Sequence, residues 1–203
     1  PLITISRQLG SGGRGVANTL GARLRWPVYD RELIDEMVRR SHASRELVLD
    51  VDEKVTSRAL LWMGAIVTQE LFDHDDYRSL LLQILASLAD KGSAIILGHG
   101  ANFAPRHHPR LDVRVIAPLE SRVERLVRCE GMTRSQAILA IRQSDQRRRN
   151  FTRRVYQGDW DDASNYDLVI NTGKLATAEA AGLVEDALED LLRVAASQQT
   201  DLG

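Results

Sequence analysis

A glycine-rich segment near the start of the chain is the first place where the residues could do chemistry. It contains Gly10, Ser11, Gly12, Gly13, Arg14 and Gly15. The segment follows a short apolar run and precedes a helical pattern. A glycine loop between a strand and a helix can present backbone N–H groups to an anion, and the N-terminus of the helix adds a partial positive charge. We therefore expect this loop to bind phosphate.

The spacing of the loop fits two nucleotide-binding motifs. Gly10, Gly12 and Gly15 match the G-x-G-x-x-G fingerprint of dinucleotide-binding domains. Asp30 ends the next predicted strand, where a ribose-binding acid would stand. In the second motif, the phosphate-cradling P-loop, the last glycine precedes a cation, and Gly13-Arg14 supplies that pair. The loop taken alone favours neither motif.

A second chemical feature is the concentration of arginines in residues 142–154. Six arginines and one acid, Asp145, lie in this segment of a chain whose net charge is only −1. If a helix that begins near Thr133 continues through it, a rotation of about 100° per residue places these residues on one stripe: Ile138, Ile141, Asp145, Arg148, Arg149 and Thr152. Arg147 and Arg154 then point the other way.

Such a helix would carry guanidinium groups over the edge of a sheet. Phosphoryl transfer spreads charge over the oxygens of the transferred group, and planar bidentate donors neutralise that charge. We therefore interpret the segment as a functional lid rather than as a solvated helix face. A dinucleotide-binding domain has no use for a lid of this kind.

The elements that must position these residues are read from the alternation of apolar runs and helical patterns. Five short runs predict buried strands: Leu2–Ser6, Pro27–Tyr29, Ala94–Leu97, Val113–Ile116 and Leu168–Ile170. Helical patterns between and after them include about residues 51–71, 77–90, 119–129 and 177–196. Strands that are apolar on both faces indicate a parallel sheet with helices on each side, which binds ligands at the carboxyl ends of its strands. We expect a three-layer α/β/α fold with five parallel strands.

Length and composition limit the function classes. The 203 residues fit a single domain, and 27 basic against 28 acidic residues exclude a globally basic nucleic-acid binder. Cys129 is the one cysteine, so no intrachain disulfide can form, and a reducing, cytoplasmic location is expected. No apolar stretch approaches about 18 residues, and the start lacks a signal-peptide pattern. We expect neither a membrane nor a nucleic-acid partner.

Two continuous apolar runs on predicted helices, Leu60–Trp62 and Leu80–Leu82, are too apolar for a simple exposed face. Core packing is the first interpretation of these runs. A homodimer interface is the second.

Taken together, the motifs resemble the cytidylate kinase-like family, a branch of the nucleoside monophosphate kinases. The opening Ile5–Arg14 resembles the start of that family, with arginine at the P-loop lysine position. The other matching segments are Tyr29–Ile34, Gly98–Asn102, Asp145–Phe151 and Asn165–Thr172, in the order of the family. The resemblance implies one P-loop kinase-like domain over residues 1–203, with acceptor-binding helices at about 30–92 and an Arg-rich helical lid at about 133–160.

The resemblance also implies an activity, which is transfer of the γ-phosphoryl group of ATP to a small phosphorylated acceptor such as CMP. The glycine loop would hold the ATP phosphates, and the implied catalytic residues are Arg14, Arg148 and Arg149. The implied acceptor-binding residues are Asp30, Arg31, His99, Asn102 and Asn171. The implied lid residues are Arg142, Asp145 and Arg153. Mg²⁺ would be held mainly by the nucleotide and water rather than by a metal site of the protein.

Three alternatives remain open from the sequence. The chain could phosphorylate a different small molecule, or it could be a catalytically weak regulator that binds nucleotides. A third alternative is an NAD-binding Rossmann protein, which the arginine-rich segment and the lack of room for a substrate domain make less favoured.

Overall fold

The computed structural model describes residues 1–41 and 74–200. The helix predicted at about 51–71 and the run Leu60–Trp62 lie outside the described residues. The elements, in chain order, are β1 (Leu2–Arg7), α1 (Gly13–Leu24), β2 (Val28–Tyr29), α2 (Arg31–Ser41), α5 (His74–Lys91), β3 (Ala94–Leu97), the 3₁₀ turn η1 (Ala101–Phe103), β4 (Arg110–Ile116), α6 (Leu119–Glu130), α7 (Arg134–Tyr156), the 3₁₀ turn η2 (Ala163–Asn165), β5 (Leu168–Asn171) and α8 (Thr177–Thr200).

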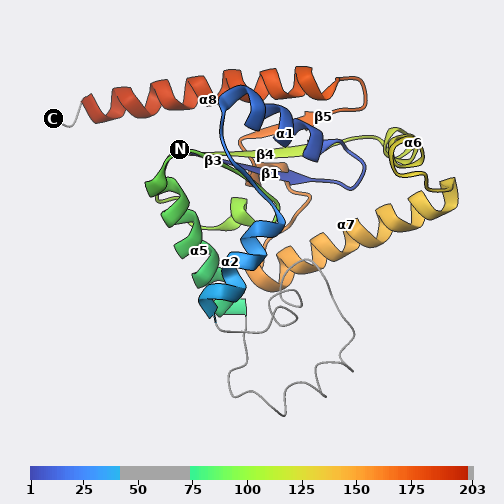
Figure 1. Cartoon of the computed structure of the whole chain (residues 1–203), viewed down its shortest axis with the longest axis horizontal. Helices are drawn as coiled ribbons and strands as arrows, with labels where there is room; N and C mark the ends of the chain where they lie inside the picture. Colours follow the sequence, from blue (N-terminus) through green and yellow to red (C-terminus); the bar gives the residue numbers. More distant parts are fainter. Residues whose placement is uncertain (42–73, 201–203) are drawn as a thin grey trace, which may run out of the picture.

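The five described strands form one parallel sheet in the order β2-β3-β1-β4-β5 (Figure 1). The predicted parallel sheet is therefore confirmed. Strand β1 lies at the centre, between β3 and β4. In the classic dinucleotide-binding fold β1 lies between β2 and β4 instead. The strand order thus removes the topological support for the NAD-binding alternative.

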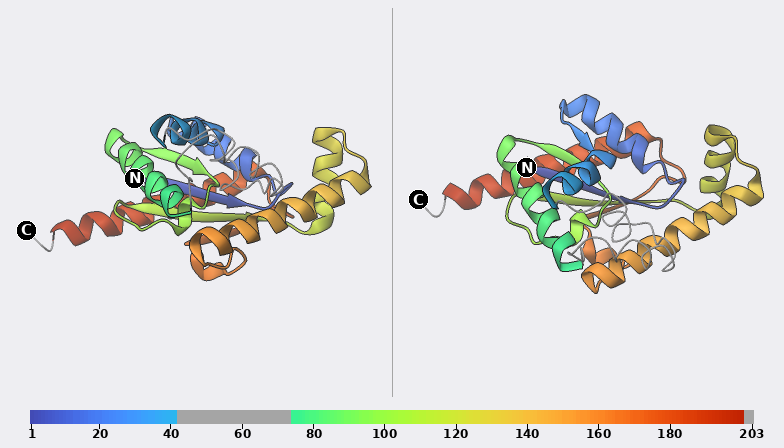
Figure 2. Two further views of the ribbon diagram at one scale, coloured as in Figure 1. Left: turned by 90° about the horizontal axis from the view of Figure 1, so that it is seen from below. Right: turned by 60° about the horizontal axis from the view of Figure 1, so that its bottom comes forward.

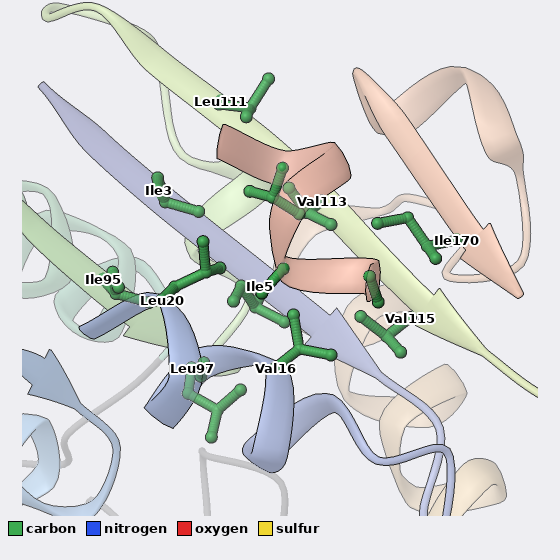
Figure 3. Packing of buried hydrophobic residues seen from close by; sticks show 14 of the residues in the cluster. Ile3, Ile5, Val16, Leu20, Ile95, Leu97, Leu111, Val113, Val115 and Ile170 are labelled. Carbon is green, nitrogen blue, oxygen red and sulfur yellow. The ribbon is translucent and has the colours of Figure 1, made fainter. Parts of the chain in front are cut away.

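One face of the sheet carries a continuous apolar cluster. Helices α1 and α8 cover it, and Figure 3 shows side chains of α1 meeting those of the strands. The labelled residues of this cluster are Ile3, Ile5, Val16, Leu20, Ile95, Leu97, Leu111, Val113, Val115 and Ile170. This layer fixes the start of α1, and therefore the glycine loop, against the end of β1.

The opposite face is apolar only toward the β2 edge. There α2, α5 and the end of α7 pack on the sheet (Figure 2). The fully buried members include Leu33, Met37, Tyr77, Leu81, Ile84 and Ile96. Leu80 and Leu81 belong to this core, so the first interpretation of the run Leu80–Leu82 holds for those two residues.

Strand β4 corrects the expectation that every strand is apolar on both faces. It begins at Arg110, earlier than predicted, and its buried residues alternate: Leu111, Val113 and Val115 face the apolar layer, while Arg110, Asp112 and Arg114 face the other side. Asp112 Oδ1 accepts a hydrogen bond from Thr4 Oγ1 at 2.6 Å and lies 2.8 Å from Arg110 Nε. Burial of these charges is tolerated because each has a partner of opposite sign or a hydrogen bond.

Helices α6 and α7 form an arm beyond the carboxyl end of β1 (Figure 2). Helix α7 begins with a capping box, in which Thr133 and Gln136 satisfy each other's backbone N–H groups. It continues without a break through the arginine cluster to Tyr156. Asp145 and Arg148 are buried on it whereas Arg147 and Arg154 are exposed, which confirms the predicted helical phase.

None of the described helices is both long enough and apolar enough to cross a membrane.

Candidate phosphate and acceptor site

The glycine loop has the backbone conformation that its composition predicts. Gly10 and Gly12 adopt left-handed conformations, with φ of 77° and 83°. A side chain there would be strained, because L-residues rarely adopt that region. Helix α1 then begins at Gly13, and no side chain caps its N-terminus. The first N–H groups of α1 are thus left for an anion.

Gly13 serves a different purpose from its neighbours. Its φ is not positive, but a Cβ added to it would lie 2.5 Å from the Cβ of Arg7. Gly13 therefore permits the end of β1 to approach the start of α1. The buried Ser11 hydroxyl, two residues earlier, has no hydrogen-bond partner among the described residues, while the Ser11 carbonyl accepts from Thr172 Oγ1.

Asp30, which follows β2, gathers the basic groups on this side of the sheet. Its carboxylate pairs with Arg14 and with Arg7, whose NH2 lies 3.4 Å from Oδ1. His99 Nε2 lies 2.8 Å from the Asp30 carbonyl oxygen and 3.8 Å from Oδ1. Burial alone would raise the pKa of Asp30, but His99, Arg7 and Arg14 outweigh it and hold that pKa below 3.8. The Arg14 guanidinium is thus paired with a carboxylate of the protein itself.

His99 is held in a constrained position between two glycines. It is a non-glycine residue with φ of 60°, and it is buried. Its carbonyl oxygen accepts hydrogen bonds from the hydroxyls of Tyr77 and Tyr156, each at 3.3 Å. These contacts, with the one to Asp30, fix the loop after β3 beside the end of β2. An observed left-handed residue in such a loop is typical of a functional position.

A small pocket opens at the carboxyl ends of β1 and β3. Its lining residues are Ser6, Arg7, Gly98, Gly100, Asn102, Arg148, Phe151, Thr152 and Trp160. Arg148 is only 8 % exposed, and the Asn102 amide nitrogen is buried with no hydrogen-bond partner among the described residues. Two guanidinium groups, an amide and aromatic walls suit an anionic group attached to a flat or small body.

Arg149 is bound to the segment that follows α7. Its Nε donates to Asp161 Oδ2, and Asp161 Oδ1 also accepts from Arg114 at 2.6 Å. Arg114 stacks over Trp160, with 4.1 Å from its guanidinium carbon to the ring centroid. Burial would raise the pKa of Asp161, but the two arginines outweigh that effect and lower it. Arg149 is therefore paired with the carboxylate of Asp161, although a lid would need the Arg149 guanidinium to bind phosphate.

Several residues implied by the resemblance do not join this group. Arg142 and Arg153 are exposed on α7, away from its buried stripe. Asp145 pairs with Arg122 of α6 at 2.7 Å. Asn171 ends β5, at the sheet edge opposite Asp30, and its Oδ1 accepts from the Gly173 N–H at 2.9 Å. Three strands lie between β2 and β5, so the sheet does not bring Asn171 together with Asp30.

Arg31 begins α2, and its side chain lies outside the described part of the structure.

Three arginines that the sequence reasoning missed belong to the site or support it. Arg7 lines the pocket, and its place at the end of β1 was a signal that could have found it. Arg122 and Arg125 of α6 donate to the Leu9 and Gly10 carbonyl oxygens of the glycine loop. Arg122 falls four residues before the buried Leu126, so helical spacing already placed it on the inner face.

Within the described residues, no group of three or more His, Cys, Asp or Glu side chains could hold a metal ion.

Comparison with known proteins points to the same kind of fold. The chain is 29% identical over 103 residues to a cytidylate kinase from Pyrococcus horikoshii, a match that covers 51% of this chain and 53% of that one. It is 33% identical over 102 residues to a uronate isomerase from Corynebacterium glutamicum, covering 50% of this chain and 19% of that protein. The chain thus matches about half the length of the first of these relatives and a smaller part of the second.

A solved structure of an uncharacterized protein from Eubacterium ventriosum superimposes with a TM-score of 0.70 at 20% identity, over 93% of this chain and 98% of the other. It shares the fold along almost its whole length. Residues 2–174 match the cytidylate kinase-like family, which spans every strand and the whole glycine loop, arginine helix and pocket described above. The chain belongs to the cytidylate kinase-like family.

Proposed function

We propose that the chain transfers the γ-phosphoryl group of ATP to a small anionic acceptor, with a nucleoside monophosphate such as CMP as the first candidate. The bond between the γ-phosphorus and its bridging oxygen to the β-phosphate breaks, and a bond to an acceptor oxygen forms. ADP leaves. Family membership and the glycine loop support the nucleotide half of this proposal.

The observation that carries the acceptor half is the pocket at the ends of β1 and β3. Arg7 and Arg148 line it together with Asn102, and the start of α1 lies beside Arg7. An acceptor whose anionic group sat between the two guanidiniums would be next to the phosphates on the loop. Catalysis in such a site comes from positioning and charge neutralisation, with little covalent work for the protein.

The phosphates of the nucleotide would have to compete with a carboxylate of the protein for Arg14. Arg14 at the start of α1 pairs with Asp30, so phosphate binding requires Arg14 to share or exchange that partner. Arg149 is similarly paired with Asp161. These two are the proposed catalytic cations on the nucleotide side, and Arg148 serves from the acceptor side. Mg²⁺ would bind phosphate oxygens and water, since the Asp30 carboxylate is already occupied by arginines.

The deciding experiment is a coupled assay of ADP release with ATP, Mg²⁺ and a panel of nucleoside monophosphates. Turnover with CMP well above that with the purine monophosphates supports the first candidate. Arg7→Ala is the matched structural test, because it should raise the acceptor KM far more than the KM for ATP. Equal effects on the two constants would contradict the assignment of the pocket to the acceptor.

A second candidate acceptor is a hydroxyl group of a small acid. Asp30 is a partly buried carboxylate between the loop cation Arg14 and the pocket cation Arg7. A carboxylate there can accept the proton of an attacking hydroxyl, a role that a phosphate acceptor does not require. One relative is named a uronate isomerase, so a related segment occurs within a protein of sugar-acid chemistry. Uronates and aldonates therefore belong in the assay panel.

The same assay separates the kinases from a regulator. Binding of ATP without turnover on any monophosphate or sugar acid would favour the catalytically weak nucleotide-binding alternative. Calorimetry on the same preparation supplies the binding measurement.

A further inference from the structure

The carbonyl side of the glycine loop is held by helix α6. Arg122 Nε donates to the Leu9 carbonyl oxygen at 2.7 Å, and Arg125 NH1 donates to the next one, that of Gly10. The loop also lies close to the backbone of α6, because a Cβ at Gly10 would lie 2.8 Å from the Arg122 carbonyl oxygen. The contact between loop and helix is therefore both polar and close.

This arrangement orients the loop for anions. The Leu9 carbonyl and the Gly10 N–H belong to one planar trans peptide, so they point in opposite directions. When Arg122 holds the carbonyl toward α6, the Gly10 N–H is turned away from α6. Arginine cations on the carbonyl side also offset the repulsion that carbonyl oxygens would exert on phosphate.

Arg122 is in turn held by α7. It is only 4 % exposed, and its NH2 lies 2.7 Å from Asp145 Oδ2. The other Asp145 oxygen, Oδ1, is buried with no hydrogen-bond partner among the described residues. A buried cation and a buried carboxylate depend on each other, since either one alone would be left uncompensated. Movement of Asp145 must therefore be followed by Arg122.

Apolar packing reinforces the same connection. Val123 and Leu126 of α6 pack with Ala137 and Ile141 of α7, and Leu9 of the loop packs against this cluster. Asp145 lies one turn after Ile141 and one turn before Arg148, which lines the acceptor pocket. The buried face of α7 thus connects the acceptor pocket, at Arg148, with Arg122, which holds the glycine loop and pairs with Asp145.

We propose that Arg122 is a positioning residue for phosphate binding, and that its pair with Asp145 couples the glycine loop to the acceptor side of α7. This rests on the proposed binding of a nucleotide by the loop. Asp145, which the sequence placed in the lid, then acts through Arg122 and not on the substrate. Coupling free energies of this kind typically correspond to affinity changes of about 5- to 150-fold.

The first test is a double-mutant cycle on the affinity for a non-hydrolysable ATP analogue. Arg122→Lys keeps the charge but cannot bridge the Leu9 carbonyl and Asp145 with a planar fork. We expect it to weaken binding about tenfold. The Asp145 carboxylate accepts from no loop atom, because Oδ2 pairs with Arg122 and Oδ1 has no hydrogen-bond partner among the described residues. Asp145→Asn should nevertheless weaken binding by a similar factor. The double variant should be little worse than either single one, because the two residues act through one link.

The matched control is Arg128→Lys, a change at an exposed arginine of the same helix. It should leave the affinity unchanged. Unchanged affinity in Asp145→Asn, or additive effects in the double variant, would overturn the proposed coupling. A purely structural role would lower the Tm of the variants without moving the affinity of the folded protein.

The second test needs no ligand, so it remains decisive if the protein binds no nucleotide. Hydrogen exchange is followed at the amides of residues 8–13 in the free protein. Arg122→Lys and Asp145→Asn should both speed exchange in this loop, while Arg128→Lys should not. Loop exchange equal to that of the wild type in both variants would refute the link itself. Faster exchange without ATP-analogue binding by the wild type would instead refute the proposed function alone.

Discussion

At the residue scale, the Asp30 carboxylate is a competitor of the nucleotide for Arg14. The two side chains are paired, and the Arg14 side chain is 63% exposed. An exposed ion pair of this kind is worth about 0.2–1 kcal/mol. Asp30→Asn should therefore tighten binding of a non-hydrolysable ATP analogue by up to about fivefold, as measured by calorimetry. Glu36→Gln, which removes the ion pairs of Glu36 with Arg39 and Arg40 on α2, is the control. Weaker binding in Asp30→Asn would mean that Asp30 orients Arg14 and does not compete for it.

The same carboxylate gives the stability of the fold a defined acid dependence. His99, Arg7 and Arg14 lower the pKa of Asp30 below 3.8 in the folded chain, although burial opposes them. A depressed carboxyl pKa contributes stability that is present above the unfolded value and lost as pH falls through the folded value. The Tm advantage of the wild type over Asp30→Asn should thus be constant near neutrality and shrink below about pH 3.8. An advantage that persists undiminished at pH 2 would refute this.

Arg148 and Arg147 are neighbours in sequence with opposite environments. Arg148 is buried at the pocket, and Arg147 is exposed on the other side of α7. Arg148→Ala should lower kcat by about 10²–10³, the scale of one preorganised charge donor, and leave ATP binding within a few-fold. Arg14→Ala should instead weaken ATP binding. Arg147→Ala should change neither, and steady-state kinetics beside calorimetry would detect any departure.

At the scale of elements, β4 carries a buried ionic face that stabilises the second side of the sheet. Asp112 is fully buried and contacts Thr4, Arg110 and Arg106. Its removal takes the carboxylate from the buried Arg110 guanidinium and leaves that charge with the carbonyl oxygens of Asn102 and Ala104. Asp112→Ala should therefore cost about 3–5 kcal/mol of unfolding free energy in urea titrations. Asp186→Ala, at an exposed position of α8, should cost under about 0.5 kcal/mol. A small loss at Asp112 would show that these two carbonyl oxygens are enough to compensate the Arg110 charge.

The buried charged residues of β4 are a part of the fold that the sequence did not predict. Apolar runs predicted the five strands because burial on both faces leaves an unbroken signal, and Ala94–Leu97 matches β3 residue for residue. Arg110, Asp112 and Arg114 carry no such signal. Their partners, such as Thr4 and Asp161, are far away in sequence, so only the assembled sheet shows that the charges are compensated.

The candidate site also has features that the sequence predicted and features that it did not. Strand ends and glycines predicted the loop, and Asp30 and His99 do come together as neighbouring strand-end loops require. The sequence does not give strand order, so it could not show that Asn171 at the end of β5 lies at the opposite edge of the sheet from Asp30. The sequence also could not predict that Arg14 pairs with Asp30 and Arg149 with Asp161. Residue type alone suggests that these arginines face a substrate.

At the scale of the whole molecule, the arrangement of the strands decides between two nucleotides that the glycine spacing alone leaves open. The order β2-β3-β1-β4-β5 puts β3 between β2 and β1. Asp30 after β2 therefore follows a strand that is not the neighbour of β1, and it contacts both Arg14 of the glycine loop and His99 of the loop after β3. A ribose-binding acid of the dinucleotide fold must instead lie on the strand next to β1.

Asp30 also already accepts from Arg7 and Arg14, whereas the ribose-binding acid of the dinucleotide fold accepts from ribose hydroxyls. We therefore expect ATP to bind and NAD to show no measurable binding by calorimetry under the same conditions. Gly10→Ala, which introduces a side chain at φ of 77° and 2.8 Å from the Arg122 carbonyl oxygen, should abolish ATP binding while far-UV circular dichroism stays the same. NAD binding without ATP binding would contradict the kinase interpretation.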